Sequence, residues 1–131
     1  MFIDNVSWIS SPPVGDVNAY VEPGGDIPEI VDIDGDGDLD FFAFNIGGGH
    51  INYYKNYQVE DGMPCDSIRI NFKDGCWGRT YQGFTMEQTL GVVCPTAQPV
   101  IDPLKTTHTG NTLCFLDADG DEDYDYLNGG V

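Results

Sequence analysis

The stretch Asp32-Ile33-Asp34-Gly35-Asp36-Gly37-Asp38-Leu39-Asp40 decides how the rest of the chain can fold. It places an aspartate at every second position of a nine-residue run, with two glycines in between. These five carboxylates are ionised at physiological pH, and they repel one another unless a cation lies among them. Oxygen ligands at alternating positions suit Ca²⁺, which takes about six to eight oxygens at about 2.3–2.6 Å. The run therefore predicts a calcium-binding loop, and its alternative interpretation is a solvated acidic turn.

A second acidic run, Asp117-Ala118-Asp119-Gly120-Asp121-Glu122-Asp123-Tyr124-Asp125, begins 85 positions after the first. Its main departure is Glu122, which stands where the first run has Gly37. Glycine tolerates a positive φ without steric cost, whereas another residue there is strained by about 1 kcal/mol or more. We therefore expect the second loop to bind calcium more weakly than the first.

The spacing of the aspartates also predicts the role of each one. Four aspartates of each run should bind through side-chain oxygens. The remaining aspartate, at the seventh loop position, should offer its backbone carbonyl. The predicted side-chain ligands are Asp32, Asp34, Asp36 and Asp40 in the first loop and Asp117, Asp119, Asp121 and Asp125 in the second, with the carbonyls of Asp38 and Asp123.

The helical EF-hand is the obvious competing interpretation, because its loop also begins Asp-x-Asp-x-Asp-Gly. That loop closes with a bidentate glutamate at position 12, and helices flank it. Position 12 is Ala43 in the first run and Asn128 in the second, and neither residue can close the site as glutamate does. The flanking sequence is short, aromatic and glycine-rich, which is typical of strands. We therefore predict an all-β fold, with strands at 39–46, 50–56, 66–72, 89–93, 112–116 and 124–127 and a turn at 128–130.

Composition limits the classes of partner. The net charge is −17, from 22 acidic and 5 basic residues, so the basic footprint that nucleic acid or an anionic membrane would need is missing. No run of 18 apolar residues is present, so we expect no membrane insertion. Hydrophobic residues make up 40% of the chain, which favours a folded core over disorder.

The four cysteines and the predicted calcium loops indicate an oxidising compartment outside the cell, because disulfides and millimolar Ca²⁺ are both found there. We expect Cys76 to pair with Cys94, with Cys65 as the rival partner, and Cys114 to be a buried free thiol. No signal peptide is recognisable at Met1. We therefore expect a secreted or cell-surface chain whose export signal was removed or lies elsewhere in a longer protein.

The sequence offers little for catalysis. His50 and His108 are the only histidines, and no Gly-x-Ser-x-Gly motif is present, so we expect no enzyme. Trp77 and Tyr81 could stack on sugar rings, although packing in the core is the commoner role of such aromatic residues.

The segment 32–56 resembles an FG-GAP/VCBS-type repeat, the calcium-loop blade unit of integrin α-like β-propellers. The resemblance rests on Val31-Asp32-Ile33-Asp34-Gly35-Asp36-Gly37-Asp38-Leu39-Asp40-Phe41 and on the glycine turn before Ile51-Asn52-Tyr53-Tyr54-Lys55-Asn56. The segments Cys76-Trp77-Gly78-Arg79 through Cys94 and His108-Thr109-Gly110-Asn111-Thr112 look similar to repeat-containing bacterial surface proteins exported by the type IX system. This resemblance implies propeller blades, a structural calcium ion and a role in adhesion or surface assembly.

A propeller needs about four to eight blades, and this chain has material for about two, so we expect an incomplete propeller. Its expected parts are an irregular segment or the end of a preceding blade (1–26), a first calcium-loop repeat (27–57), an insertion with the Cys-Trp-Gly region (58–110) and a second, truncated repeat (111–131).

Two functions follow as hypotheses. The first is a non-catalytic, calcium-binding repeat segment that contacts other repeats of a larger protein or neighbouring surface proteins. The alternative is a calcium-dependent module that binds or acts on carbohydrate, with glycans as partners.

Overall fold

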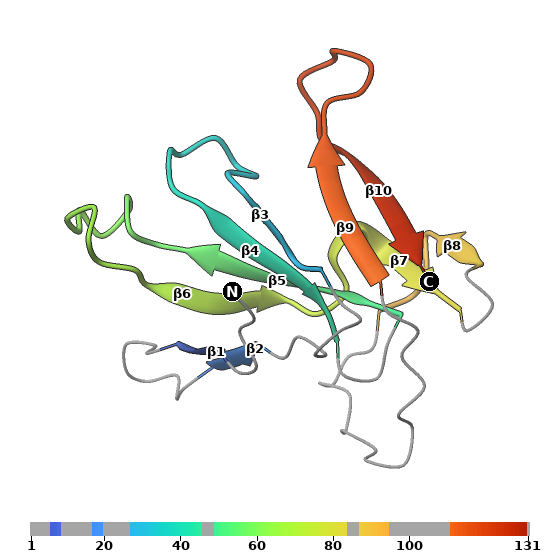
Figure 1. Cartoon of the computed structure of the whole chain (residues 1–131), viewed down its shortest axis with the longest axis horizontal. Helices are drawn as coiled ribbons and strands as arrows, with labels where there is room; N and C mark the ends of the chain where they lie inside the picture. Colours follow the sequence, from blue (N-terminus) through green and yellow to red (C-terminus); the bar gives the residue numbers. More distant parts are fainter. Residues whose placement is uncertain are drawn as a thin grey trace.

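The computed structural model describes residues 6–8, 17–19, 27–45, 49–83, 87–94 and 111–130, and these residues form an all-β fold with one short 3₁₀ helix. The largest sheet is antiparallel with the strand order β3-β4-β5-β6 (Figure 1). Its strands are β3 (Glu29–Val31), β4 (Asp40–Phe44), β5 (Ile51–Asn56) and β6 (Ile70–Asp74). The predicted all-β class is confirmed, and the described residues form no closed propeller.

Three two-stranded sheets complete the described chain. They pair β1 (Val6–Trp8) with β2 (Val17–Ala19), β7 (Thr80–Gln82) with β8 (Gln88–Leu90), and β9 (Asn111–Leu116) with β10 (Asp125–Gly130). The helix η1 (Trp77–Arg79) lies between β6 and β7. The segment 95–110, within the expected insertion, and most of the N-terminal segment 1–26 lie outside the described residues.

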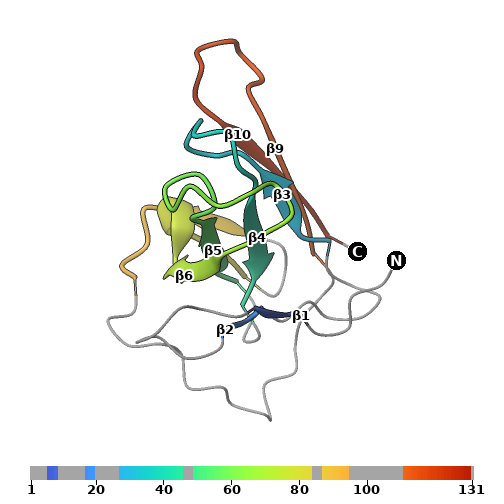
Figure 2. The ribbon, with the colours of Figure 1, turned by 90° about the vertical axis from the view of Figure 1, so that its left-hand side faces the viewer.

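The two acidic runs are the loops of two equivalent hairpins. In the first hairpin, Val31 pairs with Asp40 across β3 and β4. In the second, Leu116 pairs with Asp125 across β9 and β10, so each partner is displaced by the same 85 positions. Both loops extend to the same end of the molecule (Figures 1 and 2). The internal repeat inferred from sequence is therefore also a repeat of backbone pairing.

The main core lies between the large sheet and the second hairpin. Phe42 on β4 is fully buried, stacks on Tyr53 with ring centroids 4.7 Å apart, and meets Phe115 of β9 edge-on at 4.8 Å. Leu113 joins this core, and its N–H donates to the carbonyl of Ile27 at 3.1 Å. The second hairpin is therefore fixed beside β3.

The opposite face of the large sheet has its own apolar layer. Its buried residues are Phe41, Ala43, Tyr54 and Ile70, with Phe72 packed against them. Beside this layer lies a groove of about 600 Å³, where Ile30, Leu39 and Ile68 are exposed. The apolar layer itself is buried, and the apolar surface that remains exposed lies in this groove.

Two expectations about the second hairpin are wrong. The turn predicted at 128–130 is part of β10, because these residues continue to pair with 111–113 of β9. Cys114 is exposed instead of buried. Neighbouring residues of a strand point to opposite faces, so Leu113 and Phe115 face the core while Cys114 faces away from it.

Candidate metal centres

The first acidic loop is shaped by hydrogen bonds to one carboxylate. Asp32 accepts the N–H groups of Gly35 at 2.8 Å, Asp36 at 3.1 Å and Gly37 at 3.0 Å. Gly35 and Gly37 have φ values of 73° and 99°, which only glycine adopts freely. The aspartate at the start and the two glycines therefore encode a tight turn.

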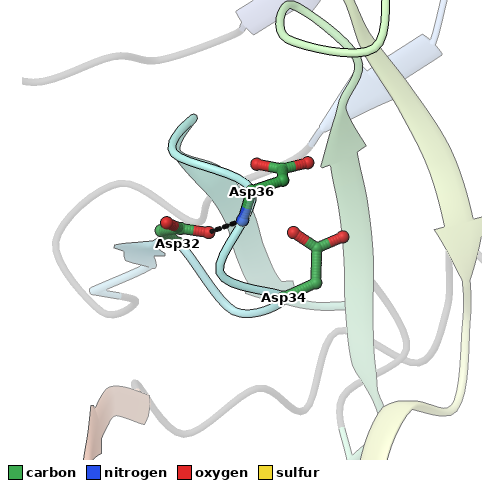
Figure 3. Close-up of side chains that lie close together, drawn as sticks. All are labelled: Asp32, Asp34 and Asp36. Carbon is green, nitrogen blue, oxygen red and sulfur yellow. Dashed lines mark hydrogen bonds between the residues drawn. The ribbon is translucent and has the colours of Figure 1, made fainter.

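This turn gathers three of the predicted ligands. Asp32, Asp34 and Asp36 each present a carboxylate oxygen, and the three oxygens lie within 4.8 Å of one another (Figure 3). A set of hard, anionic oxygen donors fits Ca²⁺ and suits softer metals poorly.

Asp40 lies outside this group of three carboxylates. It is fully buried, and it accepts the Asn56 N–H at 2.8 Å and the Tyr53 hydroxyl at 3.2 Å. Burial raises the pKa of Asp40 to about 6, against these two hydrogen bonds. Both of its oxygens connect the start of β4 to β5.

Lys55 on β5 supplies a positive charge to the first loop. Its ammonium bonds the carboxylates of Asp34 and Asp36, the latter at 3.0 Å. It also pairs with Glu60 at 2.7 Å. Burial disfavours the charged form of Lys55, but the hydrogen bonds to these three carboxylates outweigh it and raise the pKa of Lys55 above its usual range. For Asp36, the Asp38 N–H and then Lys55 lower the pKa.

The second loop repeats the hydrogen bonds of the first. Asp117 accepts three N–H groups, and Asp121 accepts a fourth. The donors to Asp117 are Gly120 at 2.6 Å, Asp121 at 3.1 Å and Glu122 at 3.2 Å, and the donor to Asp121 is Asp123 at 3.0 Å. The equivalent fourth bond in the first loop runs from the Asp38 N–H to Asp36, also at 3.0 Å.

The ligand group of the second loop differs from that of the first. Asp117, Asp119 and Asp125 present carboxylate oxygens within 4.8 Å of one another, so here the aspartate at the ninth position joins the group. Glu122 has a φ of 72°, which confirms the expected positive φ at the position of Gly37. The predicted ligands Asp121 and Asp123 stay in the loop outside this group.

Sequence reasoning missed Lys55 and Glu60. Lys55 follows Asp40, the end of the first loop, by 15 residues and Glu60 follows it by 20, and neither belongs to the repeated acidic run. The available signal was that Lys55 is one of only five basic residues and directly follows two tyrosines in a predicted strand. Glu60 offered no signal, because it follows β5 in a turn between 57 and 62.

The predicted disulfide is confirmed. Cys76 and Cys94 are bonded with their Cα atoms 5.8 Å apart, whereas Cys65 and Cys114 are free and exposed. This bond ties η1 to the segment after β8.

The two aromatic candidates for sugar stacking lie in different surroundings. Trp77 packs edge-on against Phe42 at 5.0 Å and Phe115 at 4.9 Å, as a part of the main core. Tyr81 is 42% exposed and contacts His50 at 5.1 Å between ring centroids. A sugar platform made of both rings is therefore not favoured by this arrangement.

No protein-family model, curated protein or solved structure matches this chain. Within the described residues, none of the helical structure is long and apolar enough to cross a membrane.

Proposed function

We propose that this chain is a non-catalytic, calcium-binding β-repeat segment of a secreted or cell-surface protein, with a structural role in adhesion or assembly. The observation that carries the proposal is the equivalence of the two hairpins. The strand register is the same around both acidic loops, and in both loops four equivalent N–H groups donate to the aspartates at the first and fifth loop positions. Calcium would balance the carboxylates that each turn brings together.

The packing of the two hairpins supports an assignment as propeller-type blades, that is, sheets stacked face to face. The second hairpin contacts the first sheet through Leu113, Phe115 and Tyr126. The first sheet contributes residues at positions that are not equivalent to these, among them Val31 and Phe42. The contact is thus head-to-tail, and such contacts propagate from one repeat to the next.

Each repeat exposes an apolar side chain at a position whose counterpart in the other repeat is buried. In the first repeat, Ile30 is equivalent to Phe115 and is 56% exposed beside the apolar groove. In the second repeat, Leu127 is equivalent to Phe42 and is 59% exposed. Further repeats of a larger protein, or a neighbouring surface protein, would cover these exposed side chains. An isolated pair of blades would leave them in water.

The proposed location rests on redox chemistry and on calcium supply. The Cys76–Cys94 disulfide persists in oxidising compartments, where millimolar calcium is also present. Calcium at that concentration would largely occupy sites with a dissociation constant of about 0.1 mM or less.

Calorimetric titration of the full chain with Ca²⁺ tests this function, with thermal unfolding measured in Ca²⁺ and in chelator. We expect bound calcium and a higher melting temperature with calcium, because an ion that binds only the folded chain stabilises it. A chain that binds no calcium and melts at the same temperature in chelator would contradict the proposal. A glycan array with and without Ca²⁺ tests the alternative carbohydrate function.

A further inference from the structure

A second group of carboxylates shares Asp36 with the group of the first loop. Asp36, Asp38 and Glu60 each present a carboxylate oxygen, and these oxygens lie within 4.8 Å of one another. Glu60 comes from the turn after β5, where the Asp61 N–H donates to the Tyr57 carbonyl at 3.1 Å. The group therefore joins the first loop to a segment that is distant in sequence.

Asp38 is the informative member of this group. It is only 4% exposed, and one of its oxygens accepts the Val59 N–H at 3.0 Å. The other oxygen, Oδ1, is buried and has no hydrogen-bond partner among the described residues. A buried carboxylate oxygen without a partner is costly, and coordination of a cation is one way to satisfy it. The equivalent Asp123 of the second loop is exposed, so this feature is specific to the first loop.

The charges around Lys55 also favour another cation. Its single ammonium contacts Asp34, Asp36 and Glu60, while Asp32 and Asp38 lie in the same loop. Together with Asp40, these six carboxylates and one ammonium carry a net charge of −5 when all are ionised. One divalent ion leaves a charge of −3, whereas two leave only −1.

We propose that Asp36, Asp38 and Glu60 hold a second divalent cation beside the one in the first loop, with Asp36 bridging the two ions. Three carboxylates select a hard cation of the Ca²⁺ class. The ion would fix the 57–62 turn against the loop, in addition to the bond from the Val59 N–H. This site goes beyond the two loop sites of the proposed function, since Glu60 lies outside both loops.

Calcium stoichiometry of the full chain tests the proposal. We expect three bound ions in the wild type, one in each loop and one at this site. Glu60→Gln keeps the size of the side chain and removes its charge, and it should bind two ions. Glu87→Gln changes an exposed glutamate beside β8 and should still bind three. Circular dichroism of each variant verifies that the sheets remain folded.

Amide hydrogen exchange gives a second measurement at the site itself. Calcium should slow the exchange of the Val59 and Asp61 amides in the wild type and in Glu87→Gln, but not in Glu60→Gln.

The outcomes separate this site from the loop sites. A wild type with two ions, both kept in Glu60→Gln, overturns this site and leaves the proposed function intact. A single ion that Glu60→Gln removes and Asp34→Asn keeps supports this site and contradicts the loop sites. A wild type that binds no ion contradicts both.

Discussion

The two acidic loops have the same internal structure and opposite surroundings. Both have the same strand register and the same four hydrogen bonds to aspartate. In the first loop, Asp38 and Asp40 are buried and Lys55 balances part of the charge. In the second loop, every residue from Asp117 to Asp125 is exposed, and no ion pair reaches it among the described residues. The difference teaches that the motif encodes the turn, whereas the neighbouring strands decide how the turn is held without calcium.

The largest expected effect tests whether equivalent side chains of the two repeats are buried in the first and exposed in the second. Phe42→Ala removes a fully buried ring that packs on Tyr53, Trp77 and Phe115. It should lower the free energy of unfolding by about 3–5 kcal/mol, measured by urea denaturation. Leu127→Ala changes the equivalent residue of the second repeat and should cost less than about 1 kcal/mol, because that side chain is largely exposed. Equal losses would contradict the assigned faces.

A second matched pair compares the ninth aspartate of each loop. Asp40→Ala leaves the buried Asn56 N–H and Tyr53 hydroxyl without their acceptor. In chelator it should lower the free energy of unfolding by about 3 kcal/mol. Asp125→Ala loses one exposed bond, from the Ala118 N–H, and should cost about 0.5 kcal/mol. If Asp125→Ala were the more damaging change, the comparison of the loops would be reversed.

The sequence was sufficient to predict what the chain encodes locally. The alternating aspartates and glycines predicted both turns, and the Gly37-to-Glu122 difference predicted the positive φ of Glu122. The aromatic residues that follow the first loop predicted β4 and β5. The pairing of Cys76 with Cys94 was also predicted correctly.

What the sequence could not predict depends on contacts between distant segments. The ammonium of Lys55 reaches the first loop only because β5 pairs with β4. Glu60 approaches Asp38 because the turn after β5 folds back onto the loop. The exposed side of Cys114 was likewise set by tertiary packing, since only one face of its hairpin is covered.

A third prediction concerns the built-in cation of the first loop. Lys55→Met should destabilise the calcium-free chain by about 1–2 kcal/mol, because Asp34, Asp36 and Glu60 lose their shared partner. Thermal unfolding in chelator and in excess Ca²⁺ measures this, and the gain from calcium should increase in the variant. Lys73→Met, at an exposed position on β6, is the control and should change neither value. An unchanged calcium-free melting temperature in Lys55→Met would contradict the role of Lys55.

The smallest effect compares the two loops at the position where the first has Gly37 and the second has Glu122, both with a positive φ. Glu122→Gly relieves the positive φ and should raise the free energy of unfolding by about 0.5 kcal/mol, after the entropy of the added glycine is subtracted. Gly37→Ala should lower it by about 1 kcal/mol, through backbone strain alone, because a Cβ there meets no atom within 4 Å. Calcium affinity of the second loop, measured in Glu122→Gly, should increase. A weaker second site in this variant would mean that Glu122 itself contributes a ligand.

Calorimetric calcium titration of Asp34→Asn and Asp119→Asn, beside the wild type, tests the central claim most directly. These residues occupy the third position of the two loops, and each belongs to a single group of converging carboxylates. We predict that each variant loses one bound calcium ion and keeps the others, with the tighter loop site lost in Asp34→Asn. Wild-type binding in both variants, or no calcium binding by the wild type, would contradict the assignment of the two loops as calcium sites.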